Sequence, residues 1–382
     1  MPYDVIAALA LAIWTVLLLG RGAFWLCRER DDGVLSAPAR WPRVTAVIPA
    51  RNEAGCIADS VTSLTLQDYP GAFSIVLVDD DSDDGTADVA RRAVADDRAF
   101  SLIQSRGMAP GWTGKLWALR QGIDAANAAS EPPDYLLLTD ADIVHTPDSV
   151  CALVARAEAG GTVLTSLMAK LRCESLPERS HVPAFVYFFQ MLFPFHWVNN
   201  PAKATAAAAG GCMLVKADAL KAAGGIESIR GALIDDCSLA RKMKSVGPIW
   251  LGLTERVHSI RPYDSWDEVR RMISRSAYAQ LNYSPLLLLG STLGMALTFL
   301  APPLFAVFGE GLTRILGGLV WTLMALSFLP MLRFYRVSPL WGLALPAIAL
   351  AYMLYTLDSA YRTVRGQGGQ WKGRVQANAS RS

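Results

Sequence analysis

Four long apolar runs are the feature that most limits how this chain can fold. They are Val5–Leu26, Leu286–Phe308, Leu312–Leu332 and Ser338–Leu357. A helix of about 20 apolar residues crosses the hydrocarbon layer of a bilayer, and each run is about that long. Hydrophobic residues make up 52% of the 382 residues and charged residues 18%. The four runs account for much of this high hydrophobic content. Disorder is excluded for so apolar a chain, and the sequence predicts an integral membrane protein.

The first run predicts a retained anchor rather than a cleaved signal peptide. No basic stretch precedes it and no small-residue cleavage site follows it. Arg28, Arg30 and Arg40 follow the run, whereas Asp4 is the only charged side chain before it. Because basic residues favour the inner face of a membrane, we expect the segment after the anchor to be cytoplasmic.

The number of C-terminal spans stays open at two or three. Three spans would place the tail outside, although it carries basic residues that favour the inside, namely Arg362, Arg365, Lys372 and Arg374. The adjacent Pro302 and Pro303 make 286–308 the run most expected to be broken or re-entrant. We therefore divide the chain into an anchor (1–27), a cytoplasmic domain (40–284), a C-terminal membrane region (285–357) and a basic tail (358–382).

Net charge and cysteine usage exclude two further classes of protein. The formal net charge is +2, so nothing in the overall charge predicts a nucleic-acid partner. The six cysteines contain no C-x-x-C pair, which favours reduced, cytosol-facing thiols over a disulfide framework.

The cytoplasmic domain alternates short apolar strands with amphipathic helices. Strands are expected at Val44–Ile48, Ser74–Val78, Ser101–Gln104 and Tyr135–Leu138, and helices from Ile57, from Ala87 and over Lys115–Ala129. This alternation predicts an α/β domain, a Rossmann-like and mostly parallel sheet with helices on both faces. Ligands bind such sheets at the carboxyl ends of the strands.

Three of these strands end in polar or acidic residues. The segments are Pro49–Glu53, Asp79–Thr86 and Asp140–Asp142. An alternative for the second is a solvated turn in which Asp84 or Thr86 caps the next helix. Two carboxylates one residue apart after a buried strand provide hard oxygen ligands for Mg²⁺ or Mn²⁺.

Taken together and in this order, VIPARNE, LVDDDSDDGT and TDAD resemble the family 2 glycosyltransferases, which have the GT-A fold. Gly111–Lys115, Gly210–Leu214 and Ile234–Asp236 extend the resemblance over about residues 44–282. The N-terminal anchor, the apolar runs after the domain and the ending Gly369–Arg374 look most like the hopanoid-associated branch. Ceramide glucosyltransferases share the general layout.

The resemblance implies a role for each strand-end residue. Pro49, Ala50, Arg51 and Glu53 would line the nucleoside pocket, and Asp79 and Asp80 would reach the base and ribose. Lys115 would meet the diphosphate, a role that its position beside glycines at a helix start also favours; a solvated helix lysine is the alternative. Asp142, helped by Asp140, would hold Mn²⁺ or Mg²⁺ against the donor phosphates.

Asp236 is the candidate general base, which would take the proton of an acceptor hydroxyl in an inverting displacement. The negative charge of Asp235 is expected to raise the pKa of Asp236 towards the working pH. The alternative is a carboxylate that only stabilises the start of a helix over Cys237–Ser245. Asp235 stands where the family usually has Glu.

The family's Q-x-x-R-W element is altered in this chain. Its counterpart is Met272–Ser276, which keeps Arg275 but lacks the glutamine and the tryptophan. This favours transfer of a single sugar over polymer synthesis. Arg275 is expected either to bind the pyrophosphate or to face solvent on an amphipathic helix, Trp266–Leu281.

The segment Ala184–Val198 is unusually aromatic for a cytoplasmic domain. It predicts either a helix at the membrane surface, with Tyr187 and Trp197 near the polar layer, or a helix of the protein core. The flanking His181 and His196 lack paired ligands and are interpreted as ordinary polar contacts rather than metal ligands.

The resemblance thus implies a metal-dependent glycosyltransferase in a bacterial-type inner or plasma membrane. It would move one sugar from a nucleotide-sugar, expected to be a UDP-sugar, to a lipid acceptor such as a hopanoid or another polyisoprenoid. The alternatives are a polyprenyl-phosphate glycosyltransferase, a processive polysaccharide synthase and a non-catalytic nucleotide-sugar-binding scaffold. The scaffold would require a degraded metal or base position, whereas Asp142 and Asp236 are both present.

Overall fold

A computed structural model describes residues 2–33, 35–94, 98–366, 368, 370–371 and 374–375. The chain divides into two compact units. The first unit comprises Met1–Arg28, Cys173–His196 and Pro262–Gly369. The second comprises Glu29–Arg172, Trp197–Arg261 and Gln370–Ser382.

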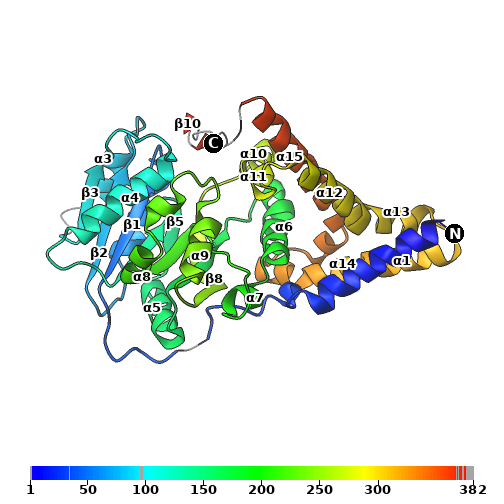
Figure 1. Ribbon diagram of the computed structural model, residues 1–382, viewed down its shortest axis with the longest axis horizontal. Coiled ribbons are helices and arrows are strands. Elements are labelled where there is room, and N and C mark those ends of the chain that lie inside the picture. Colours follow the sequence, from blue (N-terminus) through cyan, green and yellow to red (C-terminus); the bar gives the residue numbers. More distant parts are fainter. Residues whose placement is uncertain are drawn as a thin grey trace. The chain divides into compact units, whose positions relative to one another are not determined.

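An eight-stranded mixed sheet forms the centre of the second unit (Figure 1). Its strand order is β3-β2-β1-β4-β7-β6-β8-β5. The bounds are β1 Val44–Ala50, β2 Phe73–Asp79, β3 Phe100–Gln104, β4 Tyr135–Thr139, β5 Ile143–His145, β6 Leu164–Leu171, β7 Cys212–Lys216 and β8 Ile249–Ser259. The four predicted strands, β1 to β4, are parallel to one another, and β6 is parallel to β8. β7 is antiparallel to β4 and β6, and β5 is antiparallel to β8. The predicted α/β sheet is confirmed, and four of its seven strand pairings are parallel.

The central strands of this sheet are buried along their whole length. All seven residues of β1 and all five of β4 are buried, as expected for strands covered on both faces. The helices of the unit are α2 Ile57–Thr65, α3 Thr86–Val94, α4 Gly114–Asn127, α5 Ser149–Gly160, α8 Ala217–Ala222 and α9 Asp235–Lys244; α7, Phe195–Asn199, leads into the unit from the first. α4 lies directly on β1 and β2, and Gly122 leaves room for this close packing, since a Cβ there would clash with Val47.

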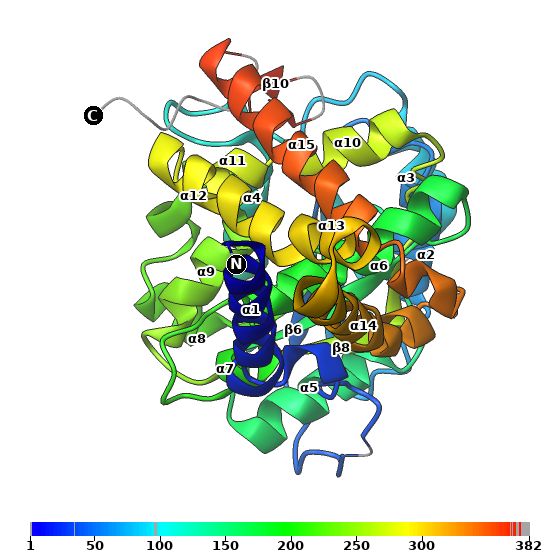
Figure 2. The same cartoon turned by 90° about the vertical axis from the view of Figure 1, so that its right-hand side faces the viewer.

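Among its described residues, the first unit has three helices that are long and apolar enough to cross a membrane. They cover Pro2–Gly20, Pro285–Phe308 and Gly311–Phe334. The segment Pro2–Gly20 consists of α1, Pro2–Thr15, and a π-helical turn, Val16–Gly20. Figure 1 shows α1 lying along α14, Gly311–Phe334, and Figure 2 shows the same two helices nearly end-on. The Trp14 indole donates to the Thr298 carbonyl at 2.8 Å.

The N-terminal helix ends earlier than the sequence predicts. It stops at Gly20 rather than Leu26, and a short 3₁₀ turn, Phe24–Leu26, follows. The guanidinium of Arg21 donates to the carbonyls of Met191 and Leu192, at 2.5 and 3.0 Å. These carbonyls belong to the last turn of α6, Leu176–Leu192, where a helix leaves acceptors unsatisfied. Arg21 therefore lies just beyond the N-terminal helix, and its guanidinium provides hydrogen-bond donors for the carbonyls at the end of α6.

The expected break at the adjacent prolines is not found. The chain forms α12, Pro285–Met295, a π-helical turn, Ala296–Leu300, and α13, Ala301–Phe308, without a loop between them. Pro302 and Pro303 fall in the first turn of α13, where a helix tolerates residues without an N–H.

The fourth apolar run does not form one of the three candidate spans. It folds as a 3₁₀ turn, Pro339–Gly342, and the first part of α15, Leu345–Val364. The polar end of α15 binds α10, Trp266–Ser274, because Arg270 donates to Asp358 at 2.6 Å and Ser274 donates to the Tyr355 carbonyl at 3.0 Å. Among the described helices, two C-terminal candidates for a span thus remain.

The aromatic segment is covered by protein within the first unit. Tyr187 of α6 is 1% exposed, and its hydroxyl lies 2.7 Å from that of Ser327 on α14. Phe188 packs against Phe299 and Tyr352, and Tyr352 donates to the carbonyl of His181. This part of α6 is therefore a helix of the protein core, as the second of the two interpretations predicts, and Tyr187 does not lie at a polar layer.

The predicted helix Trp266–Leu281 is interrupted. α10 ends at Ser274, and α11, Ala277–Gln280, follows after Arg275 and Ser276. In the predicted basic tail, Gln370–Trp371 pairs with Arg374–Val375 as β9 and β10, whereas Lys372 and residues 376–382 lie outside the described residues.

Candidate active site

The loops after β1 and β2 are joined by hydrogen bonds. The guanidinium of Arg51 donates to the carbonyls of Asp80 and Asp81. The backbone N–H of Glu53 donates to the Thr86 hydroxyl at 2.8 Å. The acidic segment after β2 is therefore an ordered loop that packs against the loop after β1, and the Arg51 side chain hydrogen-bonds the two loops together.

The end of β2 places a buried hydrogen-bond acceptor beside this loop. Asp79 is 3% exposed, and its Oδ2 accepts from the side-chain amide of Gln104 at 2.9 Å. Its Oδ1 is buried and has no hydrogen-bond partner among the described residues. Asp80 is also buried, as are Pro49 and Ala50 within β1. An unsatisfied buried carboxylate oxygen is costly, so Asp79 is suited to an N–H donor of a ligand.

Lys115 joins carboxylates from two other elements. Thr113 caps α4, and the ammonium of Lys115 lies 2.8 Å from Asp140 and 3.0 Å from Asp235. Burial alone lowers the pKa of Lys115, but the charges of Asp140 and Asp235 raise it well above its ordinary value. The lysine thus remains positively charged between the end of β4 and the start of α9.

Asp236 is held by two backbone N–H groups at the start of α9. Its Oδ2 accepts from Gly210 at 3.1 Å, and its Oδ1 from Cys237 at 2.6 Å. Burial, and then the negative charge of Asp235, raise the pKa of Asp236 from 3.8 to about 6. A carboxylate with a pKa near neutrality is suited to accept a proton in catalysis.

Arg261, which the sequence did not single out, joins two of the predicted residues. Its Nη2 donates to both carboxylate oxygens of Glu53, at 2.6 and 2.7 Å, and its Nε donates to Asp142 Oδ2 at 3.0 Å. The Ser259 hydroxyl donates to the same Asp142 oxygen at 3.1 Å. Ser259 is the last residue of β8, and Arg261 follows it closely. The sequence analysis searched the ends of the predicted strands, so it missed both residues because β8 was not predicted.

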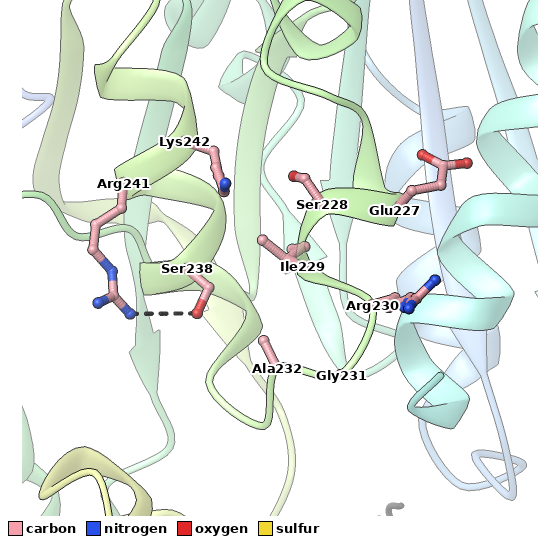
Figure 3. Close-up of a pocket in the computed structure, with 9 residues that line it drawn as sticks. All are labelled: Glu227, Ser228, Ile229, Arg230, Gly231, Ala232, Ser238, Arg241 and Lys242. Atoms are coloured by element: carbon pink, nitrogen blue, oxygen red, sulfur yellow. Dashed lines mark hydrogen bonds between the residues drawn. The ribbon is translucent and has the colours of Figure 1, made fainter. Parts of the chain in front are cut away.

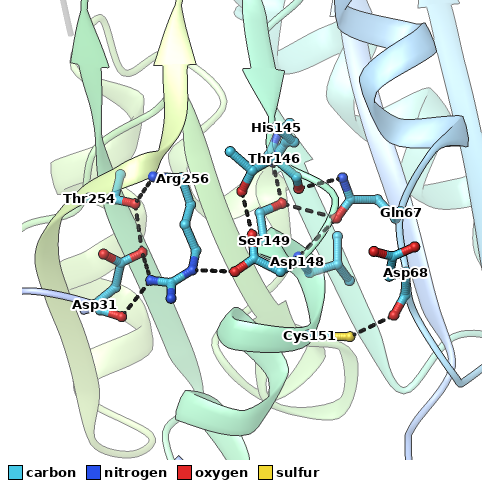
Figure 4. A network of polar contacts seen from close by, with 11 residues as sticks. Asp31, Gln67, Asp68, His145, Thr146, Asp148, Ser149, Cys151, Thr254 and Arg256 are labelled. Atoms are coloured by element: carbon cyan, nitrogen blue, oxygen red, sulfur yellow. Dashed lines mark hydrogen bonds and ion pairs between the residues drawn. The ribbon is translucent and has the colours of Figure 1, made fainter. Parts of the chain in front are cut away.

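A buried histidine that the sequence did not predict, His145, ends β5, the strand that follows Asp142 in the chain (Figure 4). His145 Nε2 lies 3.1 Å from the hydroxyl of Thr139, the residue before Asp140, and Nδ1 lies 3.2 Å from the Ser149 hydroxyl. Thr139 donates to the carbonyl of Gly211 at 2.8 Å. Burial lowers the pKa of His145 to about 3, so the ring is neutral at physiological pH. This hydrogen-bonded chain links the strand that precedes Asp140 to the loop whose Gly210 binds Asp236.

The charge of the site fits a divalent cation. Burial, opposed by Lys115 and reinforced by Asp142, raises the pKa of Asp140. Among the described residues, two basic side chains, Lys115 and Arg261, form ion pairs with the carboxylates of the site. The carboxylates outnumber them and are those of Glu53, Asp140, Asp142, Asp235 and Asp236. The described residues contain no group of three or more side chains that could hold a metal on their own. Asp140 and Asp142 provide hard oxygen ligands, and Mg²⁺ sites of this kind are completed by water and phosphate.

Arg275 belongs to the first unit, whereas the other predicted site residues belong to the second. Its side chain is exposed, directly after α10. A role for Arg275 at the diphosphate stays a prediction.

Comparison with known families now gives the site its context. A family model described as glycosyl transferase family 2 matches residues 45–224. A second model, described as glycosyl transferase family group 2, matches residues 135–356, more than half of the chain.

Individual relatives are more distant. An undecaprenyl-phosphate 4-deoxy-4-formamido-L-arabinose transferase of Salmonella choleraesuis is 27% identical over 126 residues, 32% of this chain and 36% of that protein. An N-acetylglucosaminyltransferase of Mesorhizobium japonicum is 28% identical over 139 residues, 35% of this chain and 31% of that protein. The chain thus matches about a third of the length of each of these curated relatives.

A solved structure shares the fold over nearly the whole chain. It is a mannosyltransferase from Pyrobaculum calidifontis in complex with GDP-Man and Mn²⁺, 19% identical, with a TM-score of 0.58 over 93% of this chain and 99% of that chain. The sheet, with helices on both faces, is that of the GT-A fold. From the family models and this architecture, we conclude that the chain belongs to the family 2 glycosyltransferases.

Proposed function

We propose that the protein transfers a single sugar from a nucleotide-sugar to a lipid acceptor, with inversion at the anomeric carbon. The observation that carries this proposal is the arrangement of Asp236, whose pKa is about 6, beside the Lys115–Asp140–Asp235 cluster. A base of this kind is needed when the acceptor atom is a hydroxyl oxygen, because the proton must leave as the new bond forms.

The donor is proposed to be a uridine or guanosine diphosphate sugar. Asp79 Oδ1 is a buried acceptor, and Gln104 fixes the carboxylate through its other oxygen. Uracil and guanine each present a ring N–H at the pairing edge, whereas the corresponding ring nitrogen of adenine or cytosine is an acceptor. Asp79 therefore favours the first two bases, and UDP is the form implied by the resemblance.

The carboxylates after β4 are proposed to hold a divalent ion. Asp142 and Asp140 would bind Mn²⁺ or Mg²⁺, which neutralises charge on the leaving diphosphate. Lys115 is proposed to orient the diphosphate, since its ammonium already lies at the end of β4. Arg261 fixes the Asp142 carboxylate against Glu53. In the transfer itself, Asp236 accepts the hydroxyl proton, and Asp235 keeps the pKa of that carboxyl high.

Membrane residence is proposed from the three apolar helices. Basic residues after the first helix favour a cytoplasmic position for residues 40–284. The second and third helices then cross outward and back, which returns α15 to the cytoplasmic side. With two C-terminal spans, the basic residues after residue 357 would lie on the cytoplasmic side, which basic residues favour. The acceptor is proposed to be a hopanoid or another polyisoprenoid in the inner leaflet, following the branch that the sequence resembles.

A polyprenyl-phosphate acceptor is the second candidate. The observation in its favour is the relative from Salmonella choleraesuis, whose name specifies undecaprenyl-phosphate. A phosphate oxygen attacks without a general base, so the two candidates make opposite predictions for Asp236.

Lipid analysis tests the proposed acceptor. Mass spectrometry of membrane lipids from cells with and without the gene should reveal one glycosylated lipid that depends on the gene. A re-introduced Asp142→Asn variant should fail to restore it, and a re-introduced Lys221→Gln variant should restore it, since Lys221 is exposed on α8. Unchanged lipids, or a gene-dependent polymer instead, would contradict the proposal.

A further inference from the structure

Lys244, the last residue of α9, places its ammonium among four backbone carbonyls. The distances from Nζ to these carbonyl oxygens are 3.2 Å for Trp197, 2.7 Å for Val198, 3.1 Å for Asn200 and 2.6 Å for Thr205. The carbonyls belong to the end of α7 and the loop that follows it, within a segment of residues 197–210 that leads to β7. Hydrogen bonds from an ammonium are stronger than neutral ones, so Lys244 fixes the path of this segment.

The partners of Lys244 differ from those of the lysine in the carboxylate cluster. Lys115 binds Asp140 and Asp235, whereas every acceptor of Lys244 among the described residues is a backbone carbonyl. Burial lowers the pKa of Lys244, and the partial negative charges of the four carbonyls stabilise its ammonium. Replacing this lysine takes one donor from each of the four carbonyls, all of which lie in the same segment.

The same segment also contacts the first turn of α9. Asp236 Oδ2 accepts from the backbone N–H of Gly210 at 3.1 Å. Asp236, Ala240 and Lys244 are spaced four residues apart, so their side chains lie on one face of the helix. Ala240, between the other two, is buried. One face of α9 therefore lies along the segment, with Gly210 bound at its first turn and Thr205 at its last residue.

The opposite face of α9 borders a pocket of about 630 Å³. Figure 3 shows Ser238 and Lys242 on this side of the helix, with the loop of residues 227–232 across the pocket. Arg241 also lines the pocket, and its Nη2 donates to Ser238 of the same helix at 3.5 Å. Among the described residues, side chains of α9 form hydrogen bonds or ion pairs with other elements only in its first turn and at Lys244. The polar contacts that fix α9 against its neighbours therefore lie at its two ends.

We propose that Lys244 is a positioning residue for Asp236, because it fixes the last residue of α9 against the segment that carries Gly210. The ten residues of α9 span about 15 Å, and a helix of this length moves as a unit. Once its last residue is released, α9 is free to tilt about its first turn, and the Asp236 carboxylate loses its alignment with the Gly210 N–H. The inference rests on the proposed function, in which Asp236 is the general base.

Hydrogen exchange measured by mass spectrometry tests this contact with neither sugar donor nor acceptor present. The purified full chain is compared with Lys244→Met and with a matched variant, Lys242→Met, which changes an exposed lysine of the same turn on the opposite face. Amides of residues 206–210 should exchange faster by about tenfold or more in Lys244→Met, as expected when a hydrogen bond to a charged group is lost. Strands β1 and β2 should exchange as in the wild type, and so should every peptide of Lys242→Met.

Transfer of labelled sugar to a total lipid extract tests the consequence for Asp236. In Lys244→Ala, the rate of transfer should fall by about tenfold or more while the affinity for UDP stays unchanged, and Lys242→Met should match the wild type in both. Added n-propylammonium, which replaces the atoms that the substitution removes, should restore part of the rate in a saturable manner. Tetramethylammonium, which has a positive charge but no N–H donor, should not restore it.

Unchanged exchange of residues 206–210 in Lys244→Met overturns the proposal, as does wild-type transfer by Lys244→Ala or equal rescue by the two cations. Faster exchange in β1 and β2 as well, or loss of UDP binding together with transfer, shows a general structural role and overturns it too. A wild type that transfers no sugar contradicts the proposed function instead, and the exchange experiment still decides whether Lys244 fixes the segment.

Discussion

Replacing Asp236 by Asn tests the assignment of the general base with little change in shape. Both carboxylate oxygens accept backbone N–H groups, from Gly210 and Cys237. The amide nitrogen of Asn must therefore face one of these donors, and its oxygen cannot accept the hydroxyl proton. Loss of a general base lowers the rate by about 10²–10⁴-fold, and we expect a fall of this size in the rate of transfer with little change in UDP binding.

The pKa of Asp236 also predicts how stability changes with pH. Because folding raises this pKa from 3.8 to about 6, the neutral carboxyl is favoured in the folded state. Its contribution to stability is complete below pH 3.8 and is lost as the pH rises to about 6, a change of at most about 3 kcal/mol. Between about pH 4.5 and pH 7, the wild type should lose about 2 kcal/mol of unfolding free energy that Asp236→Asn does not lose.

Thermal unfolding and transfer rates, measured in the same detergent across this pH range, provide the assay. The midpoint of Asp236→Asn relative to the wild type should rise by about 5 °C from the acidic to the neutral end. Asp235→Asn serves as the matched variant, because removing its charge should lower the pKa of Asp236 and shift the acidic limb of the rate profile to lower pH. An Asp236→Asn variant that transfers sugar at the wild-type rate would refute the assignment and favour a phosphate acceptor.

Three further substitutions test the contacts around the site. Lys115→Met leaves Asp140 and Asp235 without their cation, so unfolding free energy should fall by about 3–5 kcal/mol and UDP-sugar binding should weaken, whereas Lys221→Met should change neither in calorimetry. Arg261→Gln frees Asp142 from a competing cation, so Mn²⁺ affinity measured by electron paramagnetic resonance with UDP present should rise by about tenfold; a fall would show that Arg261 supports the metal site. His145→Leu breaks the chain from Ser149 to Thr139 and should cost about 2 kcal/mol or more in chemical unfolding. Because burial lowers the pKa of His145 to about 3, its folded form is neutral, and the wild type should lose stability below about pH 6.5 in a way that His145→Leu does not.

The sequence predicted the parts of the fold that depend on local pattern. Continuous apolar strands placed Asp79 and Asp140 at the same edge of the sheet, at the ends of the strands on either side of β1, because parallel strands put their carboxyl ends at one edge. The period and length of each apolar run are sufficient to predict these elements.

The unpredicted parts depend on contacts between distant residues. Arg261 reaches Glu53 across 208 positions, and Gln104 reaches Asp79 from a strand that reads only weakly as such. The polar end of α15 likewise packs on α10 through the ion pair between Asp358 and Arg270. A hydropathy profile of the sequence does not reveal such a pair. Partners of this kind become visible only when the packing is known.

Measurement of the transfer reaction itself tests the proposed function most directly. The purified full chain, reconstituted with a total lipid extract and Mn²⁺, is incubated with labelled UDP- and GDP-sugars, and the product is extracted into organic solvent. We predict lipid-soluble label from one donor, carrying a single sugar per lipid, which is lost in Asp142→Asn and Asp236→Asn but not in Lys221→Gln. Label that stays in the aqueous phase with every donor, or that enters a polymer, would contradict the central claim.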